Sequence, residues 1–320
     1  MQSSEDVRPA VTDATDHSDP SCRATIGHPA RVTVVASGVL DLVRPRQWVK
    51  NVIVAAAPLA AGALTEPGVA RDTAIAFVAF CLASSATYCV NDVIDADADA
   101  RHPTKRRRPI PSGRVSRRTA VALGAVLAVA AVLVAQPGEL RWVVLGYLAL
   151  TLAYSTMLKH QPVVELGLVS GGFILRAIAG GAATGLPLSQ WFLIVAGFGS
   201  LFMVTGKRLS ELASIQDGDD APVRRSLAHY PLSYLRMILG VSAAVTVTAY
   251  CLWAFETSAG RPGAVWTTVS TVPFVLALLR YALDADRAAV EEPEEVVLRD
   301  PTLLSLGVLW LVTFTLGVAL

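Results

Sequence analysis

One face of a predicted helix near residue 95 carries four oxygen-bearing side chains, those of Asn91, Asp92, Asp95 and Asp99. At about 100° per residue these positions fall within an arc of roughly 100°, whereas Asp97 points elsewhere. Three carboxylates in that geometry repel one another unless cations lie between them, and hard oxygen ligands suit Mg²⁺. This acidic stripe therefore predicts a magnesium site at which Asp92, Asp95 and Asp99 are catalytic.

The acidic stripe follows a long apolar run, from Thr73 to Val90, whose composition is that of a membrane segment. Ionisable groups at membrane depth are costly and by default functional. The alternative is an acidic helix end at the membrane surface that binds no metal. A basic stretch follows the stripe at once, and this favours the metal site.

That basic stretch is broken by prolines, and its charged residues are Arg101, Lys105, Arg106, Arg107, Arg108 and Arg114. Guanidinium and ammonium groups beside metal-bound carboxylates can clamp a diphosphate, so Lys105 and Arg106 are predicted to bind substrate. Cytoplasmic loops of membrane proteins are basic in any case, and topology alone is an equally good explanation for most of these side chains.

The composition indicates a polytopic membrane protein in contact with membrane lipid. The 320-residue chain is 53% hydrophobic and 17% charged, and its mean hydropathy is +0.50, too apolar for an ordinary soluble globule. A net charge of +1 gives no reason to expect binding to nucleic acid. The four cysteines show no paired or metal-type spacing, and the three in apolar segments are expected to be small buried residues.

Nine apolar spans with short connections predict an all-α membrane helix bundle. They cover about 48–65, 73–94, 118–136, 140–158, 162–185, 189–206, 232–256, 264–285 and 302–320. The first span is the weakest because Pro58 interrupts it. The fifth contains Glu165 and Arg176, so it is expected to lie inside the bundle rather than against lipid.

The residues before the bundle differ in composition from the rest. They are polar and rich in Ser, Thr, Asp and Pro, with no basic segment leading into an apolar core. Residues 1–35 are therefore predicted to be a disordered cytoplasmic tail, and 36–320 a transmembrane catalytic domain.

The connections between spans alternate in charge and predict the orientation. Eight basic residues lie between the second and third spans and four between the sixth and seventh, whereas the alternate connections carry only Arg71 and Arg261. Basic connections remain in the cytoplasm. The N-terminus and the chemistry are thus predicted on the cytoplasmic side of the plasma membrane, and the C-terminus outside.

Other polar clusters lie at the same ends of the predicted helices. Lys207 and Glu211 are one helical turn apart, which fits either a surface ion pair or a site where Lys207 and Arg208 take phosphate and Glu211 orients them. Trp48 could serve as an interface anchor. The residues predicted to bind substrate are Lys50, Asn51, Asn91, Lys105, Arg106, Tyr154, Lys159, Arg176, Lys207, Arg208 and Glu211.

The motif Asn-Asp-x-x-Asp-x-x-x-Asp, at the end of the second of nine helices, resembles that of the UbiA superfamily of intramembrane prenyltransferases. The resemblance implies that the motif binds Mg²⁺ and a diphosphate substrate. Classical members carry a second Asp-rich motif after the sixth helix. Here Lys207-Arg208-x-x-Glu211 takes that place, so the resemblance does not extend to the second metal site.

Four ungapped blocks, at 44–51, 102–106, 158–165 and 175–181, resemble one branch of this superfamily, the decaprenyl-phosphate phosphoribosyltransferases of actinobacterial cell-wall arabinan synthesis. The likeness covers about residues 40–320. It implies transfer of 5-phosphoribose from phosphoribosyl diphosphate to decaprenyl or another polyprenyl phosphate, with release of diphosphate. An apolar channel for the polyprenyl tail, opening at the cytoplasmic face, is expected.

The acceptor in that reaction is already an anionic phosphate, so no strong general base is needed. His102 and His160 are therefore expected to be hydrogen-bonding or loop residues.

One alternative function is that of a prenyltransferase that moves an isoprenoid chain to an aromatic acceptor. Another is a transporter, which predicts polar residues near the membrane midplane and inverted repeats, and the sequence displays neither. The chain could also form a homo-oligomer.

Overall fold

The computed structural model describes residues 37–136, 138–216, 227–258, 262–290, 296 and 299–320. The predicted tail lies outside these residues, as do Arg224, Arg225 and Arg261 of the predicted connections. Helices are the only regular secondary structure in the described part of the chain, which confirms the all-α fold.

Eight helical segments are long and apolar enough to cross a membrane. They are α3 (Pro67–Asp99), α4 (Arg117–Val134), α5 (Leu140–Ala153) with the π-helical turn η3 (Tyr154–Leu158), α6 (Val164–Thr184), α7 (Gln190–Gln216), α8 (Leu232–Ser258), the pair α9 (Ala264–Val269) and α10 (Thr271–Asp286), and α12 (Pro301–Ala319). They correspond to eight of the nine predicted spans.

Several helix starts follow from local sequence. Proline occupies the first turn of α3 and of α12, where its missing N–H costs nothing. Ser116 caps α4 by accepting the Thr119 N–H at 3.0 Å, and Asp300 caps α12 by accepting the Thr302 N–H at 2.8 Å.

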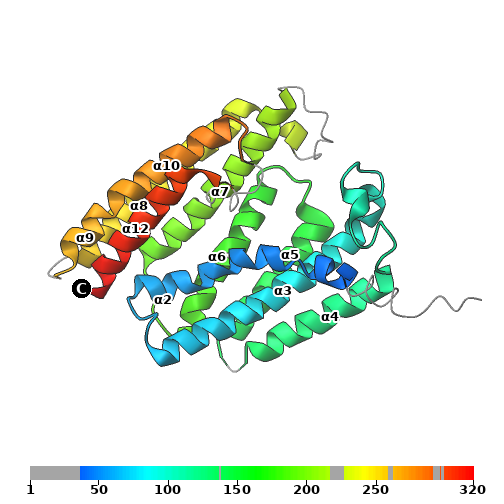
Figure 1. Cartoon of the computed structure of the whole chain (residues 1–320), viewed down its shortest axis with the longest axis horizontal. Coiled ribbons are helices and arrows are strands. Elements are labelled where there is room, and N and C mark those ends of the chain that lie inside the picture. Colours follow the sequence, from blue (N-terminus) through cyan, green and yellow to red (C-terminus); the bar gives the residue numbers. More distant parts are fainter. Residues whose placement is uncertain (1–36, 137, 217–226, 259–261, 291–295, 297–298) are drawn as a thin grey trace, which may run out of the picture.

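The helices form two packed groups that meet along α6 and α7 (Figure 1). One group contains α3, α4, α5 and α6, and its core includes the tilted ring pair Phe80–Tyr147. The other contains α7, α8, α9, α10 and α12, with Phe202 against Tyr281 in its core. The junction of α6 and α7 is therefore where side chains of the two groups meet.

The prediction for the fifth span is confirmed. Glu165 and Arg176 on α6 are both buried in the bundle, at 0% and 5% exposure. Helix α6 contacts elements of both groups, so partners for these two charges can come from several elements.

The first predicted span differs from expectation in conformation. It is an 11-residue 3₁₀ helix, η1 (Pro45–Ala55), followed by the short α2 (Ala56–Ala60). A 3₁₀ helix rises about 2.0 Å per residue and an α-helix about 1.5 Å, so the two together extend roughly 30 Å, the thickness of a bilayer core. Propensity and hydropathy miss this because they do not report the rise per residue.

The two ends of this segment lie far apart in the bundle. Arg44, just before η1, pairs with Asp92 at the end of α3. Gly62, just after α2, lies so close to α12 that an added Cβ would be 2.7 Å from the carbonyl oxygen of Val318. The segment therefore extends from the acidic stripe to the neighbourhood of the C-terminus (Figure 1).

We expect the chain to cross the membrane nine times, with the 45–60 segment as the first crossing. Reporter fusions in the 101–116 loop and just after Gln216 should then read cytoplasmic, and a fusion after Leu320 should read external. Paired alkaline phosphatase and green fluorescent protein fusions make the measurement. A fluorescent C-terminal fusion would show that the 45–60 segment does not cross, because eight crossings return the chain to its starting side.

Candidate active site

The last turns of α3 present the acidic stripe as predicted. Asp92 and Asp99 are buried, at 1% and 5% exposure, and Asn91 and Asp95 are half-buried. Asp97 is exposed on another face and pairs with Arg117. The spacing argument therefore separated the stripe from Asp97 correctly.

Each carboxylate of the stripe contacts a cation from a distant element. Asp92 accepts a hydrogen bond from Arg44, and Asp95 accepts one from Lys159. Arg108 donates to Asp99 at 2.6 Å and lies 3.4 Å from Asp92. Three positive groups thus surround the stripe, and the site as a whole can take an anion together with a divalent cation.

Arg44 reaches the stripe through an unusual backbone conformation. It has φ 54° and ψ 61°, the left-handed region, which few non-glycine residues occupy. The ion pair with Asp92 stabilises this conformation, as does the position of the guanidinium 5.0 Å from the centre of the Tyr88 ring. Strained residues of this kind cluster at functional sites.

The residue types at the stripe fit a divalent metal, although the carboxylates are not gathered around one point. Asp92 keeps one buried oxygen, Oδ2, without a hydrogen-bond partner, and a metal ion would satisfy it. Over the described residues, no three His, Cys, Asp or Glu side chains are grouped closely enough to hold an ion. The carboxylate and amide oxygens of the stripe are nevertheless the ligand types that Mg²⁺ prefers.

The basic loop after α3 supplies fewer site residues than predicted. Arg108 reaches the acidic stripe, whereas Arg106 is exposed and Lys105 is half-buried in the short turn η2 (Lys105–Arg107). Arg114 pairs with Asp41 at 2.6 Å. Sequence alone offered no signal to select Arg108 among its neighbours, because the loop folds back in a way that spacing does not encode.

His102 serves this loop as a turn residue. Its Nδ1 accepts the Thr104 N–H at 3.3 Å, which requires that nitrogen to be unprotonated. Desolvation, and after it the positive charge of Lys105, lower the pKa of His102. The neutral form is therefore favoured, and the hydrogen-bonding role agrees with expectation. His160 is exposed.

A second charged cluster joins α6 to α7. Arg208 makes two 3.1 Å hydrogen bonds to Glu165, one to each carboxylate oxygen, and a third at 2.9 Å to Glu211. Arg208 is 4% exposed and Glu165 is fully buried. The guanidinium is thus fixed by two carboxylates, and Glu165 is a member of the cluster that the predicted set of site residues omitted.

The start of α6 is built to place Glu165. Val163 has φ 66° and ψ −49°, and the Val164 N–H lies 2.7 Å from the Pro162 carbonyl, which is the rare γ-turn. The hydroxyl of Tyr230 accepts the Val163 N–H. This turn lets Glu165 enter the bundle within the first turn of the helix.

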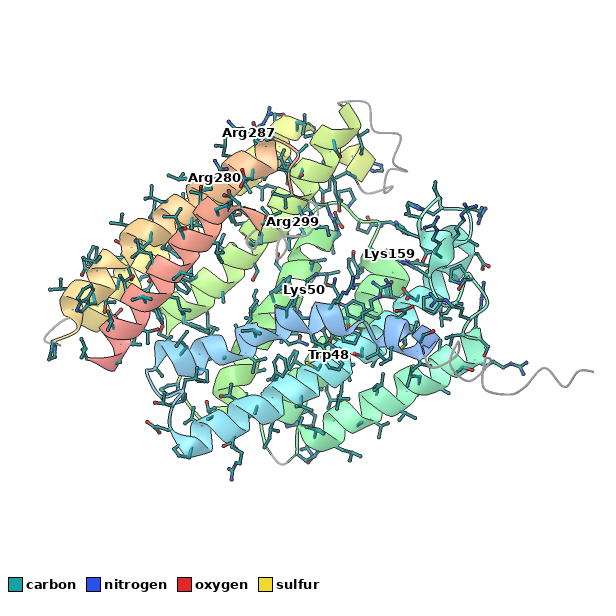
Figure 2. All side chains as sticks on the ribbon, in the orientation of Figure 1. Trp48, Lys50, Lys159, Arg280, Arg287 and Arg299 are labelled. Carbon is teal, nitrogen blue, oxygen red and sulfur yellow. The ribbon has the colours of Figure 1, made fainter. Side chains whose placement is uncertain are left out.

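An apolar cavity of about 760 Å³ lies between the two helix groups. Its polar end, the cationic mouth, consists of Lys50, Tyr154, Lys207 and Arg208. Its other end is aromatic and includes Tyr250, Trp253, Phe274, Trp310 and Phe314. Figure 2 shows Lys50 near the centre of the molecule, Lys159 to its right, and Arg280 and Arg287 on and just after α10 at the upper left. The structure therefore contains an apolar cavity with a cationic end, and its use by a polyprenyl tail stays a prediction.

Four of the eleven residues predicted to bind substrate line this cavity, and Asn51 and Arg176 are among the others. Asn51 and Arg176 are buried on the opposite side of η1 and α6 and hydrogen-bond to each other at 2.7 Å. Arg176 also donates to Tyr147 and to the Gly172 carbonyl, each at 2.9 Å. Tertiary packing turns both side chains inward, away from the cavity lining, so the cavity gives no support to direct contact of this pair with substrate.

Comparison with known proteins places the chain in a family. The sequence profile of the UbiA prenyltransferase family matches residues 52–299. The chain belongs to the UbiA prenyltransferase family. It is 44% identical over 314 residues to a decaprenyl-phosphate phosphoribosyltransferase of Mycolicibacterium smegmatis, and the match covers 94% of this chain and 97% of the relative. The enzyme of that name from Mycobacterium tuberculosis H37Rv is 47% identical over 294 residues, 89% of this chain and 95% of the relative.

Solved structures share the fold of this UbiA protein. A UbiA homologue from Archaeoglobus fulgidus bound to DMAPP and Mg²⁺ superposes with a TM-score of 0.65 at 16% identity, over 88% of this chain and 98% of the other. A structure of digeranylgeranylglyceryl phosphate synthase gives 0.63 at 13% identity, over 89% and 99%. At such identities the likeness establishes the helical fold alone.

The ion cluster at Arg208 should stabilise the junction of α6 and α7. Glu165→Leu leaves the buried guanidinium with one carboxylate fewer, and breaking a buried pair typically costs about 3–5 kcal/mol. Unfolding of the purified protein by SDS, followed by circular dichroism, measures the change in the free energy of unfolding.

Asp97→Asn is the matched control for this measurement. It breaks the exposed pair with Arg117 and should change the free energy of unfolding by only about 0–1 kcal/mol. Equal small changes in both variants would show that the Arg208 cluster does not stabilise the junction.

Proposed function

We propose that this UbiA protein is a membrane phosphoribosyltransferase. It transfers 5-phosphoribose from phosphoribosyl diphosphate to decaprenyl or another polyprenyl phosphate and releases diphosphate. The observation that carries the proposal is the apolar cavity whose polar end holds Lys50, Lys207 and Arg208. Its shape and charge suit a long apolar tail with an anionic head, and near full-length relatives bear the name of this activity.

Mg²⁺ would be held by the acidic stripe, with Asp92, Asp95 and Asp99 as carboxylate ligands and Asn91 as an amide ligand. The partnerless Oδ2 of Asp92 supports this assignment. When bound, the ion neutralises charge on the diphosphate and so makes it a better leaving group.

The cations beside the stripe assist in the same task. Arg44, Arg108 and Lys159 already lie within hydrogen-bond distance of its carboxylates. Guanidinium groups bind phosphate oxygens in pairs, so Arg44 and Arg108 are placed to orient the diphosphate and to stabilise it as it departs from C1 of the ribose.

The acceptor phosphate would bind at the cationic mouth. Lys207 and Lys50 provide ammonium groups there, and Tyr154 provides a hydroxyl. Arg208 is tied to Glu165 and Glu211, so its main effect is to fix the end of α7 and the position of its neighbour Lys207. The acceptor oxygen is already charged, and the reaction needs no strong base at this point.

This arrangement gives the two anionic substrates separate binding places. The acidic stripe, with Arg44 and Arg108, would receive the diphosphate together with its metal ion, and the side-chain cations of the mouth would receive the phosphate of the lipid. We place both at the cytoplasmic face of the plasma membrane, in the formation of precursors for cell-wall arabinan. The cations at Lys207-Arg208, where classical family members carry acid, suit this pair of substrates.

The acidic stripe should be essential and linked to metal. We expect Asp92→Asn or Asp95→Asn to lower turnover by about two to three orders of magnitude, since the lost contribution is stabilisation of the leaving group. Turnover of purified, folded protein is measured with labelled phosphoribosyl diphosphate over a range of Mg²⁺ concentrations. Asp97→Asn is the control, because Asp97 lies off the stripe and should matter much less. Near-normal turnover of Asp92→Asn at ordinary Mg²⁺ would refute the assignment.

Lys207 should be needed for use of the phosphorylated acceptor. A desolvated, charge-assisted contact to phosphate contributes about 1.5–3 kcal/mol, so Lys207→Ala should reduce kcat/KM for polyprenyl phosphate roughly ten- to hundred-fold. Lys207→Asp should be worse because it adds repulsion. The measurement is incorporation of label from phosphoribosyl diphosphate into the lipid fraction.

A parallel assay tests the prenyltransferase alternative. It supplies polyprenyl diphosphate together with aromatic acceptors such as 4-hydroxybenzoate. Product in this assay, with no label entering lipid from phosphoribosyl diphosphate, would show that the protein moves isoprenoid chains instead.

A further inference from the structure

The 3₁₀ helix η1 presents three distinct faces. With three residues per turn, positions three apart lie on one line along the helix. Trp48, Asn51 and Val54 form the inner face, and the last two of them are fully buried. Lys50, Ile53 and Ala56 form a second face that lines the cavity. Val52 is about half exposed and faces outward, and Val49, also about half exposed, lies at the border of the outer face and the cavity, whose lining it joins.

These faces exist only in the 3₁₀ conformation. In an α-helix each step of three residues turns through about 300°, so positions 48, 51 and 54 would spread over roughly 120°. The residues that pack inward would then no longer share one face, and neither would the residues that line the cavity. Runs of 3₁₀ helix longer than three or four residues are uncommon, so eleven residues in this form require support from their surroundings.

That support comes from the inner face. Trp48 donates its indole N–H to Ser85 at 3.0 Å, and Ser85 donates to the Val43 carbonyl at 2.9 Å. The amide of Asn51 donates to Ser84 and to the sulfur of Cys81, both at 3.3 Å. These contacts attach the segment to α3.

Arg176 completes the attachment from α6. Its Nε donates to the Asn51 side-chain oxygen at 2.7 Å, and its other nitrogens donate to Tyr147 and the Gly172 carbonyl. The guanidinium also stacks on the rings of Tyr147 and Phe173, at 4.8 and 5.2 Å. All of these hydrogen-bond acceptors are neutral groups. Burying a cation without a negative partner costs free energy, so a residue of this kind in a membrane bundle is expected to be functional.

We propose that Arg176 is a positioning residue that holds the 45–55 segment in its 3₁₀ form through Asn51 and thereby keeps Lys50 at the cationic mouth. The inference rests on the proposed function only in taking the acceptor phosphate as the ligand of Lys50. Asn51 is adjacent to Lys50 in sequence, so fixing one side chain inward fixes the direction of the other toward the cavity.

A double-mutant cycle in binding tests this directly. The full-length protein in detergent is titrated with decaprenyl phosphate, and Kd is determined for wild type, Lys50→Ala, Arg176→Gln and the double variant. Lys50→Ala should weaken binding roughly ten-fold, the loss of one charge-assisted phosphate contact. Arg176→Gln should weaken binding by nearly as much as Lys50→Ala does. The double variant should bind no more weakly than Lys50→Ala alone. Additive losses would overturn the proposal, because they would mean that Arg176 does not act through Lys50.

Three further variants separate positioning from general stability. Arg176→Lys keeps the charge and one donor and should recover part of the affinity. Asn51→Ala breaks the same contact from the other side and replaces Arg176→Gln if that variant does not fold. Arg280→Gln, the control, removes an arginine that bonds Asp300 at 2.7 Å and does not line the cavity, and should lower thermal stability without changing Kd.

The outcomes also separate this inference from the proposed function. Coupled losses of affinity in a protein that transfers no phosphoribose would leave the role of Arg176 intact and reject the proposed reaction. Phosphoribosyl transfer with additive losses would reject only the role of Arg176. Wild-type protein that does not bind decaprenyl phosphate would count against both.

Discussion

A charge inside a membrane-embedded helix bundle is stable only where an opposite charge or several hydrogen-bonding groups lie against it. This constraint organises the protein. Asp92 and Asp99 are matched by Arg44 and Arg108, and Glu165 is matched by Arg208. Every one of these pairs joins different elements, so satisfying the charges also fixes how the helices meet.

The same constraint creates two electrostatically different places at one end of the bundle. The acidic stripe at the end of α3 is a donor set for a divalent cation with positive side chains around it. The cationic mouth between η1 and α7 opens into the apolar cavity and has no carboxylate among its lining residues in the described part of the chain. A reaction between a diphosphate and a lipid phosphate needs both environments close together but separate.

The segment that connects these places is conformationally unusual for a physical reason. As an α-helix its sixteen residues would be only about 24 Å long, whereas the 3₁₀ stretch brings the length to roughly 30 Å, which the crossing that we expect for this segment requires. The more extended helix also has a three-residue period, which separates a packed face from a cavity face. The weaker hydrogen-bond geometry of the 3₁₀ form is offset by contacts from α3 and α6.

Much of the fold could be predicted from local pattern. Hydropathy predicted nine spans, and eight of them are helices long and apolar enough to cross a membrane. The spacing of Asp92, Asp95 and Asp99 identified one helical face and excluded Asp97, and both signals depend only on neighbours along the chain. The conformation of the 45–60 segment, the selection of Arg108 from a run of basic residues and the inward orientation of Arg176 were decided by tertiary structure. Each depends on how the chain folds back in space: Arg44 meets Asp92 and Arg176 meets Asn51 across long stretches of sequence, and Arg108 meets Asp99 where the loop after α3 turns back. The energy of burying a charge is set by such partners, and local periodicity carries no information about which distant residue will provide one.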